Sequence, residues 1–211
     1  HYIQSGGKRL RCGYTTGTCA ALAAEGAAHL LLAGRAQDSV TLTTPGGLPV
    51  TAVPRYCRME AGAACCAIEK DGGDDIDATH GALIEARVER AAVPGVCVDG
   101  GAGVGRVTKP GLDQPVGAAA INRVPREMIK QAVAGVCAEH GYAGGLRVVI
   151  SIPGGEALAK RTFNPRLGIA GGLSVLGTSG VVRPMSEEAL LETIRVELNM
   201  HAVAGERGIL L

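Results

Sequence analysis

Aromatic residues are scarce in this 211-residue chain, which has no tryptophan, one phenylalanine and four tyrosines. The interior must therefore be built mainly from Ala, Val, Leu and Ile side chains. Net charge is also nearly absent, at +1, so the chain lacks the basic stripe with interleaved aromatics that is typical of nucleic-acid binding. We expect no nucleic-acid partner, and an anionic ligand would have to be bound by local groups.

Long apolar runs are missing too. No segment reaches the roughly 18 apolar residues that a membrane-spanning helix needs, and residues 1–8 form no apolar signal region. The seven cysteines include no CxxC and no zinc-ligand spacing, so we interpret them as reduced thiols buried as small apolar side chains. Together these absences predict a cytoplasmic protein with no membrane segment.

Glycine is abundant instead, at 32 residues, which predicts many tight turns and close backbone approaches. An Ala-rich run over residues 18–32 predicts a buried helix, with Thr18 as its N-cap and Gly34 beyond its end. Two β-like runs at 39–43 and 48–53 flank a Pro-Gly-Gly turn, and this pattern predicts a hairpin.

The middle of the chain alternates between strand and helix patterns. Residues 82–90 place apolar and charged side chains in turn, as in a half-buried strand. Residues 96–98 and 106–111 predict two strands around a glycine cluster. Residues 125–138 carry apolar side chains at helical spacing, with a proline in the first turn, and predict an amphipathic helix.

The last third begins with apolar runs at 146–152 and 173–176, which predict buried strands of a sheet covered on both faces. Ser186 is expected to cap a helix that ends near residue 203. Residues 208–211 have the pattern of one further strand, left unfinished.

These elements predict an α+β fold class with two domains. Residues 1–145 are expected to form an N-terminal α+β domain. Residues 146–211 are expected to form the first part of a Rossmann-like α/β domain with a buried, mainly parallel sheet.

Three hydroxyls and a glycine stand directly before the first helix. Free backbone N–H groups and the helix dipole favour an anion there, so Thr15, Thr16, Gly17 and Thr18 are candidates for binding a carboxylate or phosphate. Ordinary capping by Thr18 is the alternative. Cys19 follows in the first turn, but no histidine partner for a catalytic thiolate is evident nearby.

Four carboxylates and an imidazole crowd into residues 70–81. Their repulsion needs an offset, but the twelve-residue calcium-loop pattern is missing, and we expect no protein-bound metal. General acid or base chemistry by Asp75 or His80 is one interpretation. A solvated turn with Asx caps is the other.

Two glycine-containing loops follow predicted buried strands, at the sheet edge where ligands bind in open α/β folds. Their candidate residues for binding a cofactor are Gly154, Gly155, Glu156, Gly177, Thr178 and Ser179. The glycine cluster at 100–105 is not followed by a helix, so it fails as a dinucleotide fingerprint. It predicts either an anion-binding nest that leads to Lys109 or a tight hairpin.

Five segments resemble signatures of the CbiD family, in family order and over nearly the whole chain. They are LRCGYTTGTCAA at 10–21, GGDDIDATHG at 72–81, VTKPGL at 107–112, TFNPRLGI at 162–169 and LGTSG at 176–180, the last followed by PMS at 184–186.

The resemblance implies methyl transfer from S-adenosylmethionine to carbon 1 of cobalt-precorrin-5B, giving cobalt-precorrin-6A in anaerobic cobalamin synthesis. It implies that the carboxylates of this tetrapyrrole meet Thr15, Thr16, Lys109 and Arg126 around Gly-rich backbone donors. Cobalt belongs to the substrate, so no protein metal site is required. A homo-oligomer is left open.

Two departures from the family pattern stand out. Arg123 replaces the usual proline after Ala-Ile-Asn, and the chain stops before a further α/β portion that carries a plausible methyl-donor loop. A non-catalytic tetrapyrrole-binding module is therefore an alternative. A phosphate-binding, kinase-like α+β domain is a third interpretation, suggested by the glycine cluster.

Overall fold

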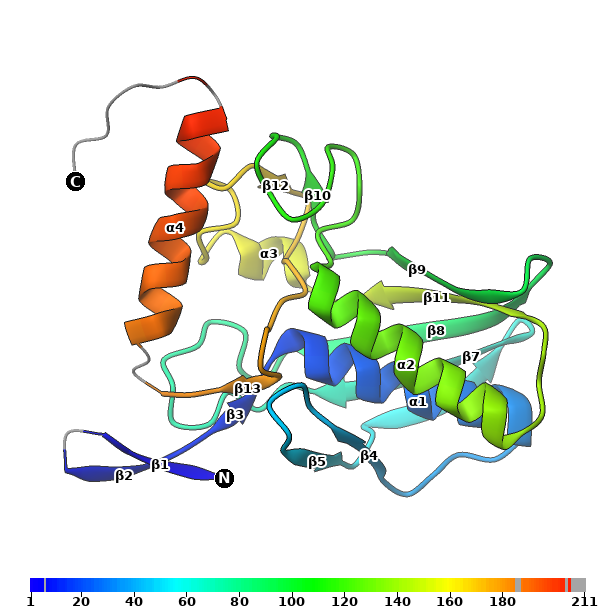
Figure 1. Cartoon of the computed structure of the whole chain (residues 1–211). Helices are drawn as coiled ribbons and strands as arrows, with labels where there is room; N and C mark the ends of the chain where they lie inside the picture. The colour runs from blue at the N-terminus through cyan, green and yellow to red at the C-terminus, as the bar shows by residue number, and fades with distance from the viewer. Residues whose placement is uncertain (6, 185–186, 204, 206–211) are drawn as a thin grey trace.

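A five-stranded mixed sheet lies at the centre of the computed structural model, which describes residues 1–5, 7–184, 187–203 and 205 (Figure 1). In spatial order its strands are β6 (Tyr56–Glu60), β7 (Ala63–Glu69), β8 (Leu83–Ala91), β11 (Gly145–Ser151) and β9 (Gly95–Gly100). All neighbouring strands run antiparallel except β11 and β9, which are parallel. The α+β class predicted from the sequence is confirmed.

The alternation in β8 separates the two faces of this sheet. Ile84, Ala86 and Val88 are fully buried in the main core, whereas the residues between them are charged and only half-buried. On the charged face Glu89 pairs with Arg147 of β11 at 3.0 Å. A sheet covered on both faces was therefore the wrong prediction for the described residues, because charged side chains on β8 and β11 keep one face in water.

Two long helices, α1 (Thr16–Ala33) and α2 (Arg123–Glu139), cover the other face and pack against each other (Figure 1). α1 is buried nearly all round, as its composition predicts, since it lies between the sheet, α2 and β4 (Val40–Thr43). Its glycines allow this closeness: a Cβ at Gly26 would lie 2.8 Å from the Cys66 sulfur. Gly34 ends α1 in the left-handed region at φ 72°, as predicted.

The start of α1 differs from the prediction. Thr15, not Thr18, is the N-cap, and its Oγ1 accepts a hydrogen bond from Thr18 N at 3.2 Å. The Thr18 hydroxyl instead donates to Gly180 O at 2.7 Å, a long-range contact that the local pattern could not reveal. In α2 the unusual Arg123 takes the first helical position, and its N–H donates to the Asp113 carboxylate.

Short ladders and two further helices surround this core. The ladders are β1 (Tyr2–Ser5) with β2 (Lys8–Arg11), β3 (Gly13–Tyr14) with β13 (Val181–Val182), β4 (Val40–Thr43) with β5 (Pro49–Ala52), and β10 (Arg106–Val107) with β12 (Ile169–Ala170). The helices are α3 (Gly155–Ala159) and α4 (Glu187–Val203). The predicted hairpin is the β4–β5 pair, and the predicted last helix is α4.

The carboxyl-terminal third differs most from the sequence expectation. β11 joins the central sheet between β8 and β9, and β12 and β13 form only two-residue antiparallel ladders. Residues 173–176 are not a strand but make isolated bridges, Leu173 with Val104 and Val175 with Ile121. The Rossmann-like features are not confirmed, and the boundary between residues 145 and 146 stays a prediction that falls after the first residue of β11.

Two expectations concern residues outside the described part, namely the cap at Ser186 and the strand at 208–211. Within the described part, no helix has the length and apolarity needed to span a bilayer.

Candidate functional site

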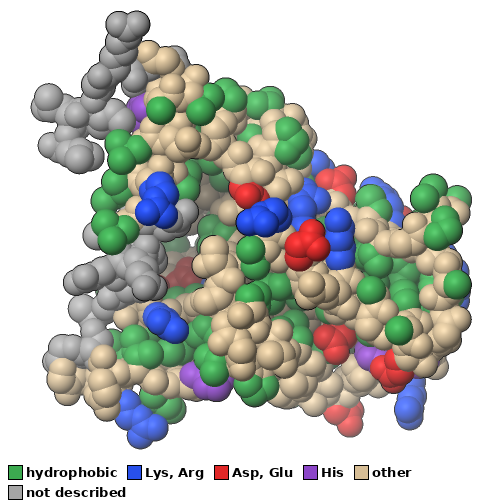
Figure 2. Space-filling model, in the orientation of Figure 1, with side chains coloured by type: hydrophobic (Ala, Val, Ile, Leu, Met, Phe, Trp, Pro, Cys, Tyr) green, Lys and Arg blue, Asp and Glu red, His purple; other side chains and the backbone are tan. Residues whose placement is uncertain are grey.

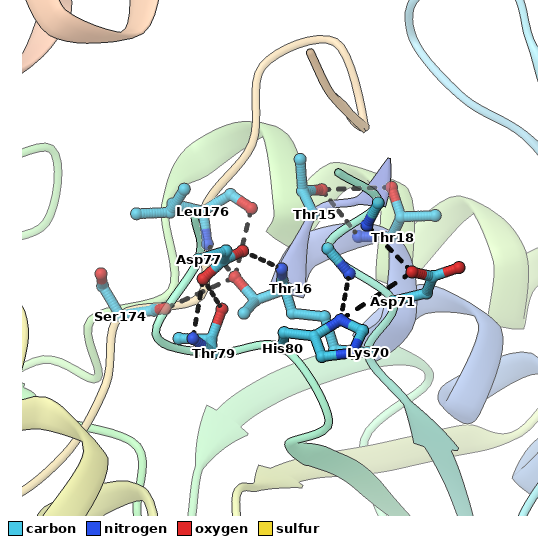
Figure 3. Close-up of polar contacts among 12 residues, drawn as sticks. Thr15, Thr16, Thr18, Lys70, Asp71, Asp77, Thr79, His80, Ser174 and Leu176 are labelled. Carbon is cyan, nitrogen blue, oxygen red and sulfur yellow. Dashed lines mark hydrogen bonds and ion pairs between the residues drawn. The ribbon is translucent and has the colours of Figure 1, made fainter. Parts of the chain in front are cut away.

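Three segments that are distant in the sequence meet at the amino-terminal end of α1 (Figures 1 and 3). They are residues 11–18, residues 70–81 and residues 174–180, and we call their meeting place the α1 junction. Tyr14 N donates to Asp71 O at 2.8 Å, and Thr15 N donates to Gly180 O at 3.2 Å. The junction thus brings together predicted substrate-binding, catalytic and cofactor-binding residues.

The threonine hydroxyls at the start of α1 hold the 174–180 segment. Thr16 Oγ1 accepts a hydrogen bond from Leu176 N at 2.9 Å and lies 3.3 Å from Leu176 O. Thr18 binds Gly180, as described above. Thr15, Thr16 and Thr18 are all buried, so their hydroxyls position a loop within the protein.

The first N–H groups of α1 also have acceptors within the protein. Gly17 N donates to Leu176 O at 3.0 Å, and Thr18 N donates to the Thr15 side chain. The Leu176 carbonyl therefore occupies the position at the helix terminus where the sequence suggests an anion. An incoming carboxylate would have to displace it or bind the outer side of the loop.

The loop itself presents the predicted cofactor residues Gly177, Thr178 and Ser179. Gly177 has φ 132° and packs so closely on Thr15 that a Cβ would overlap the threonine side chain. Ser179 O accepts a hydrogen bond from Gly46 N at 3.0 Å, which joins the loop to the β4–β5 turn. Thr178 is exposed between these two fixed residues.

Lys70 and Asp77 form an ion pair at the base of the acidic loop. The Lys70 side chain is only 2% exposed, and Asp77 also accepts hydrogen bonds from Thr79 N at 2.7 Å and from the Thr79 hydroxyl. Burial raises the pKa of Asp77, but the hydrogen bonds from Lys70 and Thr79 outweigh burial and hold this pKa below its ordinary value.

Arg11 neutralises the other side of the loop. The Arg11 guanidinium makes two hydrogen bonds to the Asp71 carboxylate, and the backbone N–H of Arg11 donates to Asp74 Oδ2 at 2.6 Å. The hydrogen bond from Arg11 is the main reason that the pKa of Asp71 is lowered. Arg11 and Lys70 therefore offset the negative charge of the carboxylates. Neither residue was predicted as functional from the sequence, although both stand inside the motifs. The predicted Asx caps are confirmed at Asp71 and Asp77.

His80 and Asp75, the predicted acid–base residues, lie in the outer part of this loop. His80 Nδ1 accepts a hydrogen bond from Gly72 N at 3.0 Å, while the side chain is 58% exposed (Figure 3). An Nδ1 that accepts leaves the proton of a neutral imidazole on Nε2. His80 therefore presents an N–H donor outward, and Asp75 is half-buried nearby in sequence.

Cys19 is not a candidate nucleophile. It is fully buried in α1, and burial raises the pKa of its thiol to about 12. The thiol therefore stays protonated at neutral pH.

A groove of about 380 Å³ lies away from these threonines, along α3 and β12. Its wall includes Glu156, Lys160, Thr108 and Gly168. Lys109 packs its aliphatic stem over Gly168 and is exposed, so its ammonium group is near this groove. Glu156 and Lys109, which were predicted to bind different ligands, are thus brought to one region.

The two remaining glycines of the prediction stand at the start of α3. Gly154 caps α3 with φ 75°, and Gly155 packs against Gly103 so that a Cβ would overlap the Gly103 carbonyl. Gly103 meets Gly172 in the same way. The glycine cluster is therefore not a hairpin, because β9 pairs with β11 and β10 pairs with β12.

Arg126 is used inside the fold. Its guanidinium donates to the carbonyls of Val98 at 2.8 Å, Ile121 at 2.8 Å and Ala119 at 3.2 Å. It ties the start of α2 to β9 and to the segment before the helix. Its predicted role in binding a substrate carboxylate stays a prediction.

The sequence of this chain matches a known protein family over most of its length. The model of the CbiD family matches residues 3–184. The chain belongs to the CbiD family. All three segments of the α1 junction fall within the matched range of this CbiD chain.

Similar proteins align with most of this CbiD chain. A cobalt-precorrin-5B C(1)-methyltransferase of Geobacillus kaustophilus is 52% identical over 204 residues, which make up 97% of this chain and 55% of that protein. The protein of the same name from Burkholderia cenocepacia is 52% identical over 93% of this chain and 54% of its own length. The chain therefore spans about half the length of the curated relatives it matches.

A solved structure agrees with the fold. The crystal structure of a cobalamin biosynthesis protein (cbiD) from Archaeoglobus fulgidus superimposes with a TM-score of 0.67 at 32% identity. The match covers 92% of this chain and 62% of that one.

Proposed function

We propose that this CbiD chain takes part in methyl transfer from S-adenosylmethionine to carbon 1 of cobalt-precorrin-5B, giving cobalt-precorrin-6A. The relatives at 52% identity carry the name of this reaction. The observation that carries the proposal is the α1 junction, where three motif segments of a CbiD chain converge on one edge of the fold.

The work of such a site is mainly positioning. A tetrapyrrole with many carboxylates must be held so that one ring carbon lies in line with the methyl–sulfonium bond. We assign the buried threonines Thr15, Thr16 and Thr18 to positioning, because the Thr16 and Thr18 hydroxyls and the Thr15 N–H bind the 174–180 loop. Gly17 supports the same loop through its N–H.

The groups that face outward are the ones we assign to the substrate. His80 would donate its Nε2 proton to a substrate carboxylate, and Asp75 of the same loop would serve any proton transfer that the reaction needs. Lys109 would bind a second carboxylate through its ammonium group. Arg126 would act on the substrate only indirectly, since three carbonyls already accept from its guanidinium.

For the methyl donor we propose the groove beside α3. Its volume of about 380 Å³ is within the usual range for small-molecule sites. Glu156 would accept hydrogen bonds from the ribose hydroxyls, and Gly154 would allow close backbone approach at the start of α3, whereas Gly155 is already packed against Gly103. The loop at Gly177, Thr178 and Ser179 is the alternative donor site, and a Rossmann-like portion would belong to the additional length that the relatives have.

A non-catalytic corrinoid-binding module is the second candidate function. The observation that favours it is the α1 junction, where the threonine hydroxyls and the N–H groups of Gly17 and Thr18 are already bound within the protein and only outward groups are left to hold a ligand. A cytoplasmic location, the absence of a nucleic-acid partner and homo-oligomer formation remain predictions.

The decisive experiment compares this chain with a version extended to the full length of its relatives. Each is incubated with cobalt-precorrin-5B and S-adenosylmethionine, and the corrinoid is analysed by mass spectrometry for one added methyl group. Methylation by the extended chain is expected. An extended chain that binds the corrinoid but never methylates it would support the binding module instead.

Residue roles are tested in the active version. Lys109→Met keeps the stem over Gly168 but removes the charge, and we expect KM for the corrinoid to rise about tenfold with kcat nearly unchanged. Lys130→Met, on the exposed side of α2, is the matched control. Equal KM values for both variants would refute the role of Lys109 while leaving the proposed function intact.

A further inference from the structure

A second cluster of polar side chains lies at the opposite end of α1 from the junction. His29 is in the last part of α1 and is 7% exposed, while Glu139 is the last residue of α2 and His140 is its C-cap. From Thr16 to His29 the helix rises about 20 Å, so this cluster is remote from the α1 junction.

The three side chains point at one another. His29 Nδ1 lies 3.3 Å from His140 Nε2, and His29 Nε2 lies 3.7 Å from Glu139 Oε2. One ligand atom from each residue falls within 4.8 Å of the other two. Two nitrogens bound to one tetrahedral metal ion at about 2.0–2.1 Å are separated by about 3.3 Å, so the imidazole pair already has the required spacing.

We propose that His29, Glu139 and His140 bind a divalent transition-metal ion of the zinc class, which joins the carboxyl-terminal ends of α1 and α2. This ion is distinct from the cobalt of the proposed substrate, and the site differs from the sequence expectation of no protein-bound metal. Two imidazoles and a carboxylate are a borderline donor set that suits Zn²⁺, Co²⁺ or Ni²⁺ better than a soft, thiolate-seeking ion.

The surroundings favour a cation. Both helices end here, and the helix dipole places partial negative charge at a carboxyl terminus. The Glu139 carboxylate adds a full negative charge. His29 is buried in α1, with Nδ1 near His140 and Nε2 near Glu139, so both ring nitrogens lie beside the other two ligands.

Solvent can reach the cluster. A cavity of about 320 Å³ opens beside it and is lined by all three residues together with Arg35, Asp38 and Ser39. This space leaves a fourth coordination position for water. Because Glu139 is 64% exposed, its side chain can rotate toward the ion without disturbing the core.

The test uses the chain after treatment with a chelator, followed by Zn²⁺ or Co²⁺ alone. We expect one Zn²⁺ per chain by calorimetry, a Tm increase of about 5 °C at saturating Zn²⁺ and the intense visible bands of four-coordinate Co²⁺. Tm and the Co²⁺ spectrum do not depend on methyl transfer, so failure here is separate from failure of the proposed function.

Surface variants identify the ligands without risking the fold. His140→Gln and Glu139→Gln alter exposed residues and should weaken Zn²⁺ binding by about 100-fold and tenfold respectively, since even indirect metal partners contribute 10-fold or more. Glu127→Gln on the exposed side of α2 and His201→Gln on α4 are matched controls that should bind as the parent does. Unchanged Zn²⁺ affinity in His140→Gln, or a parent chain with six-coordinate Co²⁺ and an unchanged Tm, overturns the proposal.

Discussion

Thr16 and Leu176 are joined by a hydrogen bond of 2.9 Å between the Thr16 hydroxyl oxygen and the Leu176 N–H, across 160 positions of sequence. Since Gly17 N also donates to Leu176 O, both polar backbone groups of Leu176 are bound at the start of α1. Together with the bond from the Thr18 hydroxyl to Gly180 O, these contacts join the TTGT and LGTSG segments.

Replacing Thr16 with valine should therefore loosen the 174–180 loop. The variant keeps the side-chain shape but leaves the Leu176 N–H without its acceptor, which should lower the free energy of unfolding by about 2 kcal/mol. Hydrogen exchange should accelerate at residues 176–180. Thr41→Val, at an exposed cross-strand threonine pair, is the control and should change stability by less than about 0.5 kcal/mol.

Gly13 should tolerate no side chain. A Cβ there would overlap the backbone of Gly72, so Gly13→Ala should push the acidic loop away from β3 and lower Tm by about 5 °C or more. Gly135→Ala is the opposite case, because that helical glycine has open space around it and alanine should stabilise α2 by about 1 kcal/mol. Equal effects of the two substitutions would contradict the close approach of these loops.

Asp77→Asn should lower the stability of the chain, because it leaves the buried Lys70 without its partner. Without its carboxylate partner the lysine charge is uncompensated, and the free energy of unfolding should fall by about 3 kcal/mol at neutral pH. Because the pKa of Asp77 is lower in the folded state, its stabilisation is present above the unfolded pKa and is lost as pH falls through the folded pKa. Urea unfolding should therefore show the parent and variant converging as the pH falls below the unfolded pKa of about 3.9.

The control for Asp77 is the exposed pair of Arg55 and Glu69. Glu69→Gln should change stability by less than about 1 kcal/mol, since solvent screens this pair. A parent chain whose advantage over Asp77→Asn persists unchanged into acid would show that the carboxylate charge is not the cause.

Glu25 on α1 should make the apo chain less stable as pH rises. Burial, with a smaller effect of Glu139, raises the pKa of this carboxyl to about 7 in the folded state, whereas the unfolded value is about 4.3. The folded chain therefore prefers the protonated form, and stability declines as pH increases from the unfolded pKa to the folded pKa. Glu25→Gln should be about 1 kcal/mol more stable than the parent at about pH 8, an amount reduced by the side chain's partial exposure, and equal to it at about pH 4.

Urea unfolding with a chelator present measures this effect without bound metal. Glu127→Gln, at an exposed carboxylate on α2, should follow the parent at both pH values. A Glu25→Gln variant with the parent's pH dependence would place the titration elsewhere.

Local elements were predictable because their signals are short-range. The Ala-rich run with Gly34 after it specifies α1, and the alternation of apolar and charged residues specifies β8. Where a distant segment supplies the partner, the sequence prediction was wrong or silent: Thr18 does not cap α1 because Gly180 binds its hydroxyl, and the 173–176 run makes bridges instead of a strand.

The candidate site divides in the same way. Each motif of the α1 junction could be found in the sequence, and the family resemblance followed from the residues of these motifs and their order along the chain. Only the tertiary structure decided which polar groups remain outward: it binds the threonine hydroxyls and the Arg126 guanidinium within the fold, and it leaves His80, Lys109 and Thr178 exposed. It also joined His29 to His140 across 111 positions, because packing α1 against α2 sets that distance and no local propensity encodes it.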